Sequence, residues 1–498
     1  MADVVLVHPR HGGLQEWMRP GRGLPLGALT ACTLASRAYD IRVIDQRLHR
    51  DWRARLVREL ASNPLCVALG VMLGKQIVHA AEVSRVVRRH SRVPVVWGGV
   101  HVSLLPEQSL ASGLMDIVVR GEGELTFLEL LRALERGRRT RAPGDLPVSL
   151  LREVPGIAFK DRGKIHVTPP RPFVDLNALP PPPYHLVDVT AYNSSLSEPP
   201  EPGTLKLQME TSRGCVQGCS FCYNPVYSRR RWRALTAVRA VERMEFLVDR
   251  YGAQTLDLVD DAFFTNPARA RDIARGLVDR DLRLRWFVQG ARIETLLRLS
   301  EEDLELLARS GLRVVRLGAE SGSLRILEAM SKPTTPRDVL AVNRKLARHG
   351  IAPWFYFTCG MPGESEEDLK RTVALLFQVL EDNPQARVVA AFCVVPMAGT
   401  EVYDQAREVD PSGVPDTLED WAKVETHVFA PWLDAAARRR LEKIFLSSMF
   451  IDRKVEHFTD SRLVRNLVRL YRPLARARLS RLRFGPMPEL WVARKLVG

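Results

Sequence analysis

The sequence predicts an α/β protein with three parts: an N-terminal doubly wound parallel sheet, a partial or complete (β/α) barrel, and a helical C-terminal region. Short apolar runs alternate with helical stretches over the first 135 residues, the alternation resumes at residue 205, and the strand signal fades near residue 400. A chain of 498 residues, 46% of them hydrophobic, can form about two to four domains with sizeable cores. This composition excludes a disordered or fibrous protein.

The N-terminal unit, residues 1–140, has the strand and helix signals of a parallel sheet. Strands are predicted at residues 4–7, 41–44, 66–71, 93–97 and 117–119. Helices are predicted at residues 26–39, 56–62, 77–90 and 125–136. The alternation implies right-handed crossovers. Ligands of such sheets bind beyond the carboxyl ends of the strands, where this sequence has glycine-containing loops at 71–75, 98–101 and 120–124.

Residues 141–204 are predicted to link the two units. The segments 157–160 and 164–167 flank Asp161, Arg162 and Gly163, which is a hairpin signal. Four prolines follow at 180–183, and they exclude a helix or a central strand there.

Residues 205–405 are predicted to form the barrel. Its strands are expected at 205–209, 255–258, 285–289, 314–318, 354–358 and 388–394. Its helices are expected at 238–251, 268–279, 301–310, 323–330, 336–349 and 366–380. Catalytic groups of parallel barrels come from the loops that follow the strands.

The C-terminal region, residues 406–498, is predicted to be helical and basic. From Asp452 to Gly498 there are 12 Lys and Arg against 4 Asp and Glu. The segment therefore has a net charge of +8 (12 − 4), over half of the +15 of the whole chain. Four leucines recur at helical spacing among arginines: Leu463, Leu467, Leu470 and Leu474. Such a helix either rests on an anionic membrane or packs its leucines on the barrel. We favour packing, because Pro473 interrupts the helical pattern and the stripe is narrow.

The N-terminal residues show no basic segment ahead of an apolar stretch, so no signal peptide is expected. The longest apolar runs are too short to span a bilayer, which takes about 20 residues. Seven cysteines are few and odd in number, which argues for reduced thiols. We therefore expect a cytoplasmic protein, with peripheral membrane contact through the basic C-terminus as the open alternative.

Three of the seven cysteines, Cys215, Cys219 and Cys222, lie in a C-x3-C-x2-C segment directly after the first predicted barrel strand. Three thiolates this close can hold one metal cluster. A zinc site would need a fourth ligand nearby, and no histidine lies between His185 and His349. A four-iron cluster held by three cysteines leaves one iron open for another ligand.

This segment resembles the signature of the radical S-adenosylmethionine (SAM) superfamily, including the aromatic Phe221 directly before the third cysteine. The resemblance extends across residues 205–405. It implies that the cysteines bind a 4Fe-4S cluster, that the open iron binds SAM, and that an external flavodoxin- or ferredoxin-type reductant supplies one electron. The family binds SAM at the ends of several barrel strands. The residues implied here are Phe221, Tyr223, Asp260, Asp261, Arg292, Glu320, Ser321 and Pro396.

The N-terminal half resembles the cobalamin-binding domain that precedes the barrel in the cobalamin-dependent class (class B) of radical SAM enzymes. The matching parts include residues 98–101 and 120–124. The resemblance implies the following cobalamin contacts: Leu73, Gly74, Gly98, Gly99, His101, Gly121, Glu122, Gly123 and Glu124. The motif D-x-H-x-x-G, whose histidine ligates cobalt in many cobalamin domains, is absent. The lower axial ligand of cobalt therefore stays open.

Together the two resemblances imply a biosynthetic C-methyltransferase. A 5′-deoxyadenosyl radical would abstract hydrogen from an unactivated carbon of a small molecule, either a natural product or a lipid, and methylcobalamin would deliver the methyl group. One alternative keeps these cofactors but ends in oxidative cyclisation or rearrangement. Another is an RNA-modifying radical SAM enzyme. RNA-methylthiolating relatives usually carry a further set of N-terminal cysteines and an appended β-rich barrel. Cys32 and Cys66 do not form a second cluster-type set, and no β-rich tail is predicted, so nucleic acid is not the expected partner.

Overall fold

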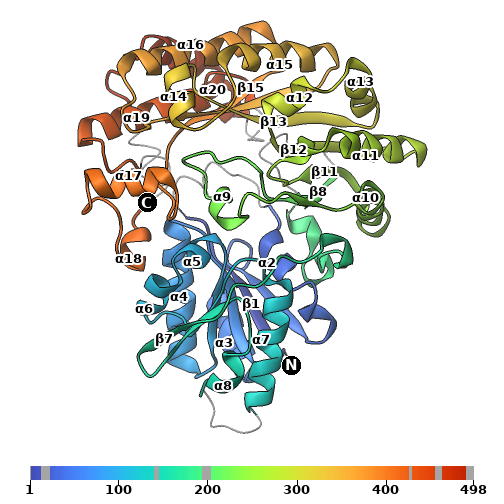
Figure 1. Cartoon of the computed structure of the whole chain (residues 1–498), viewed down its shortest axis with the longest axis vertical. Coiled ribbons are helices and arrows are strands. Elements are labelled where there is room, and N and C mark those ends of the chain that lie inside the picture. Colours follow the sequence, from blue (N-terminus) through green and yellow to red (C-terminus); the bar gives the residue numbers. More distant parts are fainter. Residues whose placement is uncertain are drawn as a thin grey trace.

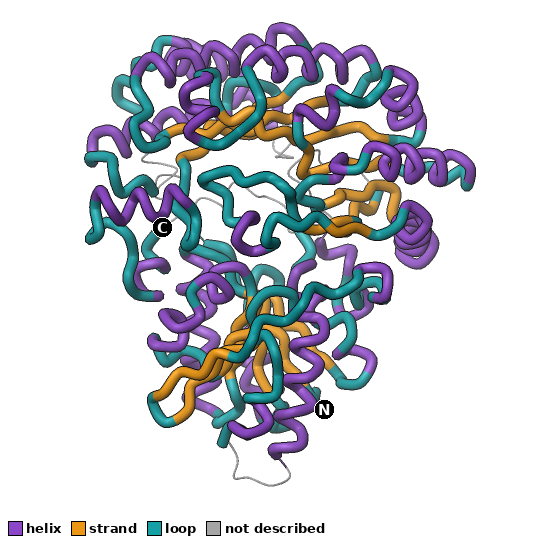
Figure 2. The backbone as a smooth tube through the Cα atoms, viewed as in Figure 1, coloured by secondary structure: helices purple, strands orange, loops and turns teal. Residues whose placement is uncertain are grey.

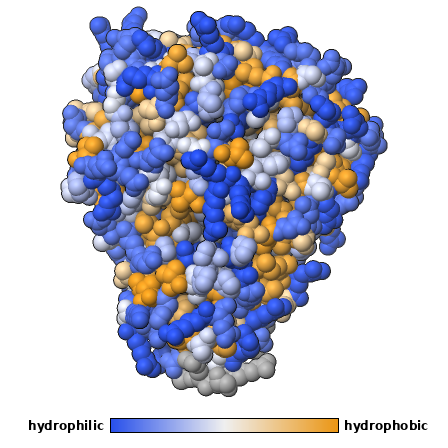
Figure 3. Space-filling view, viewed as in Figure 1, coloured by the Kyte–Doolittle hydropathy of each residue, from blue (hydrophilic) through white to orange (hydrophobic). Residues whose placement is uncertain are grey.

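In the computed structural model, two α/β units are stacked on one another, with the N-terminal sheet in one and a curled sheet in the other (Figure 1). The structure describes residues 2–12, 23–138, 145–192, 204–424, 429–454 and 462–488. Hydrophilic side chains cover most of the face seen in Figure 3, with apolar ones scattered among them. No helix in these ranges combines the length and apolar character that a membrane span requires.

The N-terminal unit contains a seven-stranded sheet with the order β2-β1-β3-β4-β5-β6-β7. Its strands are β1 (Val4–His8), β2 (Ile41–Asp45), β3 (Cys66–Gly70), β4 (Val95–Gly98), β5 (Ile117–Val119), β6 (Ile157–Asp161) and β7 (Lys164–Val167). The first five are parallel, which confirms the predicted doubly wound sheet. The β6–β7 hairpin, which we expected in the linker, instead extends this sheet, because β6 pairs antiparallel with the otherwise open edge of β5.

Helices lie on both faces of this sheet. They are α2 (Leu26–Ala31), α3 (Trp52–Leu60), α4 (Lys75–His90), α5 (Val100–Leu104), α6 (Pro106–Ala111), α7 (Gly123–Arg138) and α8 (Val148–Leu151). The helix predicted over residues 26–39 is shorter than expected: α2 stops at Ala31, and a 3-10 turn, η1 (Ala35–Arg37), follows. The Ser36 hydroxyl bonds to the Thr33 carbonyl, and such side-chain bonds compete with the helical ladder.

The second unit contains a six-stranded parallel sheet with the order β15-β14-β13-β12-β11-β8, so the barrel is partial (Figure 2). Its strands are β8 (Leu205–Met209), β11 (Ala253–Leu258), β12 (Arg285–Ala291), β13 (Leu312–Glu320), β14 (Ala352–Cys359) and β15 (Arg387–Cys393). Its covering helices are α10 (Ala237–Tyr251), α11 (Pro267–Asp279), α12 (Ile293–Leu297), α13 (Glu301–Arg309), α14 (Leu324–Ala329), α15 (Pro336–Arg348) and α16 (Glu366–Asp382). Two short strands, β9 (Ser212–Arg213) and β10 (Arg233–Ala234), pair beside the sheet.

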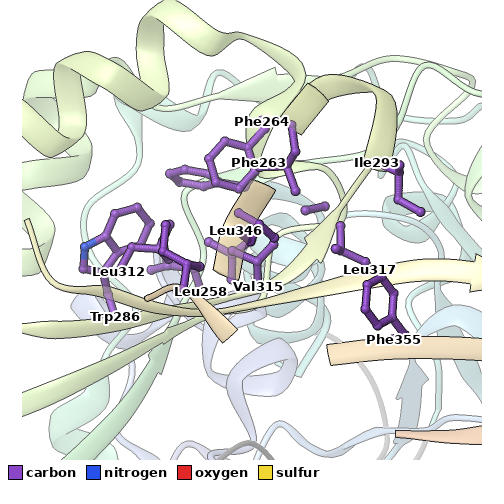
Figure 4. Close-up of a cluster of buried hydrophobic side chains, with 14 of the residues drawn as sticks. Leu258, Phe263, Phe264, Trp286, Ile293, Leu312, Val315, Leu317, Leu346 and Phe355 are labelled. Carbon is purple, nitrogen blue, oxygen red and sulfur yellow. The ribbon is translucent and has the colours of Figure 1, made fainter. Parts of the chain in front are cut away.

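Local sequence explains how these helices begin and what they cover. Helices α13, α15 and α16 each start at a capping box in which a Ser or Thr and an Asp three residues later bond reciprocally to the backbone. Between the helices and the sheet lies an apolar core that includes Phe263, Trp286 and Phe355 (Figure 4). This core fixes the outer faces of the strands and leaves their carboxyl ends free for function.

The C-terminal residues pack on both units. Helices α17 (Glu401–Val409) and α18 (Leu418–Trp421) extend along the N-terminal unit, where Trp421 meets the His101 ring edge-on at 5.5 Å (Figure 1). Helix α19 (Ala435–Met449) lies along β15 and buries Phe445. The region therefore ties the barrel to the sheet below it.

Helix α20 (Arg462–Ser480) contradicts the packing that we favoured for its leucines. Leu463, Leu467, Leu470 and Leu474 are 70%, 57%, 77% and 47% exposed. A different face is buried beside α16 and α19, through Val468, Ala475 and Leu479. Pro473 lies inside the helix rather than ending it, because this packing holds the helix on both sides of the proline.

Candidate functional site

The three-cysteine segment forms a loop between β8 and the short helix α9 (Asn224–Tyr227). Asp260, after β11, fixes the start of this loop: its carboxylate accepts bonds from the Thr211 backbone N–H at 2.7 Å and from the hydroxyls of Thr211 and Ser212 at 2.6 Å. Asp261 accepts the Gly214 N–H at 2.8 Å. Gly214 has φ +83°, and any Cβ there would collide with the Arg231 carbonyl, so only glycine fits.

The three thiols lie close enough to influence one another electrostatically. Burial, with a smaller contribution from the nearby Cys219 and Cys215, raises the pKa of Cys222 to about 12. Burial also raises the pKa of Cys219, against the opposing charges of Lys332 and Arg292. Within the described residues, no three His, Cys, Asp or Glu side chains are placed to hold a single metal ion. A donor set of three thiols on one loop suits a cluster, in which each thiolate binds its own iron.

Two cationic side chains stand beside the thiols. Lys332 donates to Glu320 at 2.9 Å, and Glu320 also accepts the Thr358 hydroxyl at 2.8 Å. Burial opposes the charge on Lys332, but Glu320 and Cys219 outweigh it and raise the Lys332 pKa. Glu320 has φ +59°, a left-handed conformation that is strained for a non-glycine residue. Arg292 pairs with Glu294 and lies against the Gln217 amide in the cysteine loop.

The residues expected to bind SAM therefore fall into separate groups. Arg292 and Glu320 adjoin the thiols, and Tyr223 and Asp261 line the large cavity described below. Ser321 is buried and hydrogen-bonded to Thr372 at 2.9 Å, so its hydroxyl serves the docking of α16.

Three further expected SAM contacts are engaged in the packing or the hydrogen bonds of the protein itself. Phe221 packs among Ile326, Met330 and Met361, and Pro396 is buried beyond β15. Asp260 already accepts three hydrogen bonds from the loop that it fixes.

A cavity of about 740 Å³ lies between the two units, at the carboxyl ends of both sheets. Glycines of the strand-end loops of the N-terminal unit, which together we call the glycine wall, line the cavity: Gly70, Gly98, Gly99, Gly121 and Gly123. Side chains of the same unit, among them Leu24, Met72 and Phe127, also line it. The barrel side contributes Gln208, Glu210, Tyr223, Tyr227 and Asp261. A large flat ligand can approach the backbone closely at the glycine wall, because these residues have no side chains of their own.

Several glycines of this wall are also required by the packing behind it. A Cβ at Gly99 would collide with the Val71 carbonyl, and Gly99 has φ +111°. A Cβ at Gly123 would lie 2.8 Å from the Ala31 Cβ. At Gly98, in contrast, the nearest atom to a Cβ is the Val119 carbonyl oxygen at 3.7 Å, so a side chain there would fit and would enter the cavity.

Three of the expected cobalamin contacts lie outside the cavity lining. His101 is buried against Trp421, where burial lowers its pKa to about 4. Leu73 packs against the core of the N-terminal unit, and Gly74 with φ +77° starts α4. The glycine motifs predicted that loops would end the strands here, but not which residues next to the glycines face the cavity.

The expected cobalamin contacts that line the cavity are the four glycines Gly98, Gly99, Gly121 and Gly123 and the two carboxylates Glu122 and Glu124. Both carboxylates are paired with arginines of the barrel unit. Arg213 donates to Glu124 at 2.6 Å and to Glu210 at 2.8 Å, and lies 3.2 Å from Glu122. Arg233 on β10 also pairs with Glu122. The two arginines outweigh burial and lower the Glu122 pKa. Burial raises the pKa of Glu210 to about 7, despite its bond to Arg213.

Sequence reasoning missed Arg213, Arg233, Glu210 and Lys332. Charged residues are common on any surface, and the sequence neighbours of Arg213 and Arg233 do not reveal partners that lie 89 and 111 positions away. The available signal was position: Arg213 precedes Cys215 by two residues, and Glu210 directly follows the first barrel strand.

Two family models match the chain in the order of its two units. The model described as "B12 binding domain" matches residues 19–131, and the model described as "Radical SAM superfamily" matches residues 209–376. An uncharacterized methyltransferase from Pyrococcus horikoshii is 27% identical over 77% of this chain and 78% of its own length. The cytidylyl-2-hydroxyethylphosphonate methyltransferase of Streptomyces wedmorensis is 28% identical over 55% of this chain, and the match spans about half (54%) of that protein.

Solved structures share the fold over nearly the whole chain. The cobalamin-dependent SAM radical enzyme OxsB, with aqua-cobalamin and SAM bound, superposes with a TM-score of 0.74 at 17% identity, covering 96% of this chain and 72% of that one. The radical SAM methyltransferase TsrM from Kitasatospora setae, with tryptophan and aza-SAM bound, gives a TM-score of 0.66 at 20% identity, covering 99% of both chains.

We predict that Cys219→Ala loses the iron–sulfur cluster without losing the fold, because two cysteines are too few to hold the open-iron form. Iron and sulfide content and visible absorbance after anaerobic reconstitution measure the effect. Cys66→Ala, which removes a buried thiol from β3, is the matched control and should load normally. Full iron content in the Cys219→Ala protein would contradict the assignment.

A second prediction concerns the glycine wall. Gly98→Val should strongly reduce cobalamin binding and leave the iron content unchanged, because its side chain enters the cavity without straining the backbone. Gly485→Val changes an exposed glycine with open space around it and should bind cobalamin like the unmodified protein. Bound cobalamin is measured by absorbance after gel filtration. Equal occupancy in Gly98→Val would show that the corrin lies elsewhere.

Proposed function

Because this chain belongs to the cobalamin-dependent radical SAM enzymes, we propose that it transfers a methyl group to a carbon atom of a small-molecule substrate. The observation that carries the proposal is that one cavity has the glycine loops of one unit on one side and the flank of the cysteine loop of the other unit on the opposite side. Relatives whose names describe a methyltransferase act on a phosphonate, a hopanoid and tryptophan. This range supports a small-molecule substrate without naming it.

The residues of this chain have separate tasks in the proposed reaction. Cys215, Cys219 and Cys222 would hold the cluster, and the glycine wall would hold the corrin. When bound, the cluster supplies the electron that cleaves SAM, and cobalamin supplies the methyl group. Asp260 and Asp261 keep the cysteine loop in one conformation through four hydrogen bonds. The Lys332–Glu320 pair places a buried positive charge beside Cys219, where thiolate charge would gather.

The substrate would bind in the part of the cavity that faces the barrel. Tyr223 and Tyr227 present rings from the cysteine-loop side, and Glu210, with 29% of its side chain accessible, faces the same space. Burial in this enclosed space would limit the access of water to a reactive centre. Polar and aromatic groups together suit a substrate with both an apolar body and hydrogen-bonding groups.

The test uses anaerobically reconstituted protein, SAM with a deuterated methyl group, and fractionated small-molecule extracts. A labelled product, in which a CD3 group replaces one hydrogen of the substrate, is expected and would be seen by mass spectrometry. A product that lost hydrogens and carries no label would favour oxidative cyclisation instead. Cleavage of SAM without cobalamin occupancy would contradict the proposal.

The partners that we propose are the small molecule and a protein that donates one electron; nucleic acid is not the partner that we expect. Peripheral contact with an anionic membrane is part of the same proposal. Its support is the exposed leucine stripe of α20, which has two exposed arginines on the same helix, Arg462 and Arg469. A helix that presents leucines and arginines to solvent suits the headgroup region of an anionic bilayer, from which a lipid substrate could be reached.

We predict that the full chain sediments with vesicles of phosphatidylserine and phosphatidylcholine at physiological salt, and that Leu467→Gln with Leu470→Gln prevents this. Both leucines are exposed, so the change removes apolar surface without opening a core. The control pair Val238→Gln and Val409→Gln removes exposed apolar side chains elsewhere. Equal sedimentation of both double variants, or none by the unmodified chain, would disprove membrane contact.

A further inference from the structure

A strongly basic surface adjoins the cysteine loop and has no role in the reaction proposed above. Arg229, Arg230 and Arg231 are consecutive and exposed, directly after α9. From Thr211 to Val241 the chain contains no Asp or Glu at all, so no carboxylate of this segment offsets their charge. In Figure 3 a group of strongly hydrophilic side chains lies over the region of α9 that Figure 1 labels.

The arginines touch the loop that carries the thiols. A Cβ at Gly218 would lie 2.7 Å from the Arg230 Cζ, so the guanidinium of Arg230 rests on the backbone directly before Cys219. On the same loop, Val216 is 46% exposed between Cys215 and Cys219. A small apolar spot that belongs to the cysteine loop is therefore bordered by positive charge.

The backbone beneath this surface is held in an unusual conformation. Arg229 and Arg230 both have φ +53°, in the left-handed region that L-residues with side chains seldom occupy. Two consecutive residues of this kind are strained, and strain of this type is retained mainly where a function requires the conformation. The Arg229 guanidinium lies 5.4 Å from the Phe173 ring, which contributes to holding the turn.

We propose that Arg229, Arg230 and Arg231, with Val216 at their edge, form the docking surface for an acidic electron-carrier protein. The inference rests on the proposed function, because a cluster at the cysteines is what the carrier would reduce. Positive charge around a small apolar spot attracts a protein with negative charge around its redox centre, and it orients the encounter. An electron then passes from the reduced carrier to the oxidised cluster, and no bond is made or broken.

The test compares a protein donor with a small one. Reduced flavodoxin and dithionite are each mixed with the reconstituted, cluster-loaded full chain, and bleaching of the cluster absorbance gives the rate. The triple variant Arg229→Gln, Arg230→Gln and Arg231→Gln should be reduced by flavodoxin about tenfold more slowly at low salt. The rate with dithionite should not change. Added salt should slow the flavodoxin reaction of the unmodified chain and bring it close to that of the variant.

A control variant separates local charge from net charge. Arg53→Gln, Arg275→Gln and Arg283→Gln also remove three exposed arginines, and this variant should react with flavodoxin at the unmodified rate. Equal slowing of both variants, or no slowing of the first, would overturn the docking surface. Slower reduction by dithionite as well would mean that the arginines only support the loop. The unmodified chain and the triple variant are also passed over immobilised RNA at low salt. If only the unmodified chain is retained and the flavodoxin kinetics of the two are equal, the surface binds nucleic acid and the docking proposal is wrong.

The failure of the proposed function is recognisable separately. An unmodified chain that takes up no iron and shows no absorbance to bleach would overturn both proposals together. A cluster that forms, cleaves SAM with dithionite and accepts electrons from flavodoxin equally well in the triple variant would overturn only the docking surface.

Discussion

The contact between Arg213 and three carboxylates joins the two units at the point where their functions meet. Arg213 belongs to the loop that leads to Cys215, whereas Glu122 and Glu124 belong to the glycine turn at the end of β5. Its side chain is 14% exposed, and its partners Glu122 and Glu124 are 10% and 1% exposed, so the pairs are largely shielded from water. Breaking such a pair leaves a buried charge without a partner, which is costly. The cysteine loop and the glycine wall are therefore held in one arrangement.

The parallel strands were predictable because they are largely buried, so most of them appear as short, mainly apolar segments between helical stretches. All long strands of both sheets occur where the runs predicted them. The errors arose where tertiary contact overrode a local signal. The β6–β7 hairpin was predicted, but its attachment to β5 was not, since pairing at a sheet edge leaves no mark in either sequence. Pro473 was expected to end a helix that packing on α16 and α19 carries through it.

The site was predictable to the extent that backbone and spacing define it. The cysteines and the glycine loops follow from motifs that leave little freedom, and the structure brings the two loops to one cavity. Side chains that we assigned to the site because they follow these motifs in sequence do not all line the cavity. His101 follows the glycine pair Gly98 and Gly99, yet the helix that starts there turns its ring toward Trp421. Burial and direction depend on elements that meet only after folding.

The charges around Arg213 also bear on the cavity itself. Two arginines, Arg213 and Arg233, face three carboxylates, Glu122, Glu124 and Glu210, so the group carries one negative charge too many when all are ionised. The excess is relieved at Glu210, whose pKa burial raises to about 7, whereas the arginines lower the pKa of Glu122. Glu210, which lines the cavity, is therefore the carboxylate of this group that takes up a proton most readily. The ion pairs that join the two units thus also set the hydrogen-bonding character of the wall that a substrate would meet.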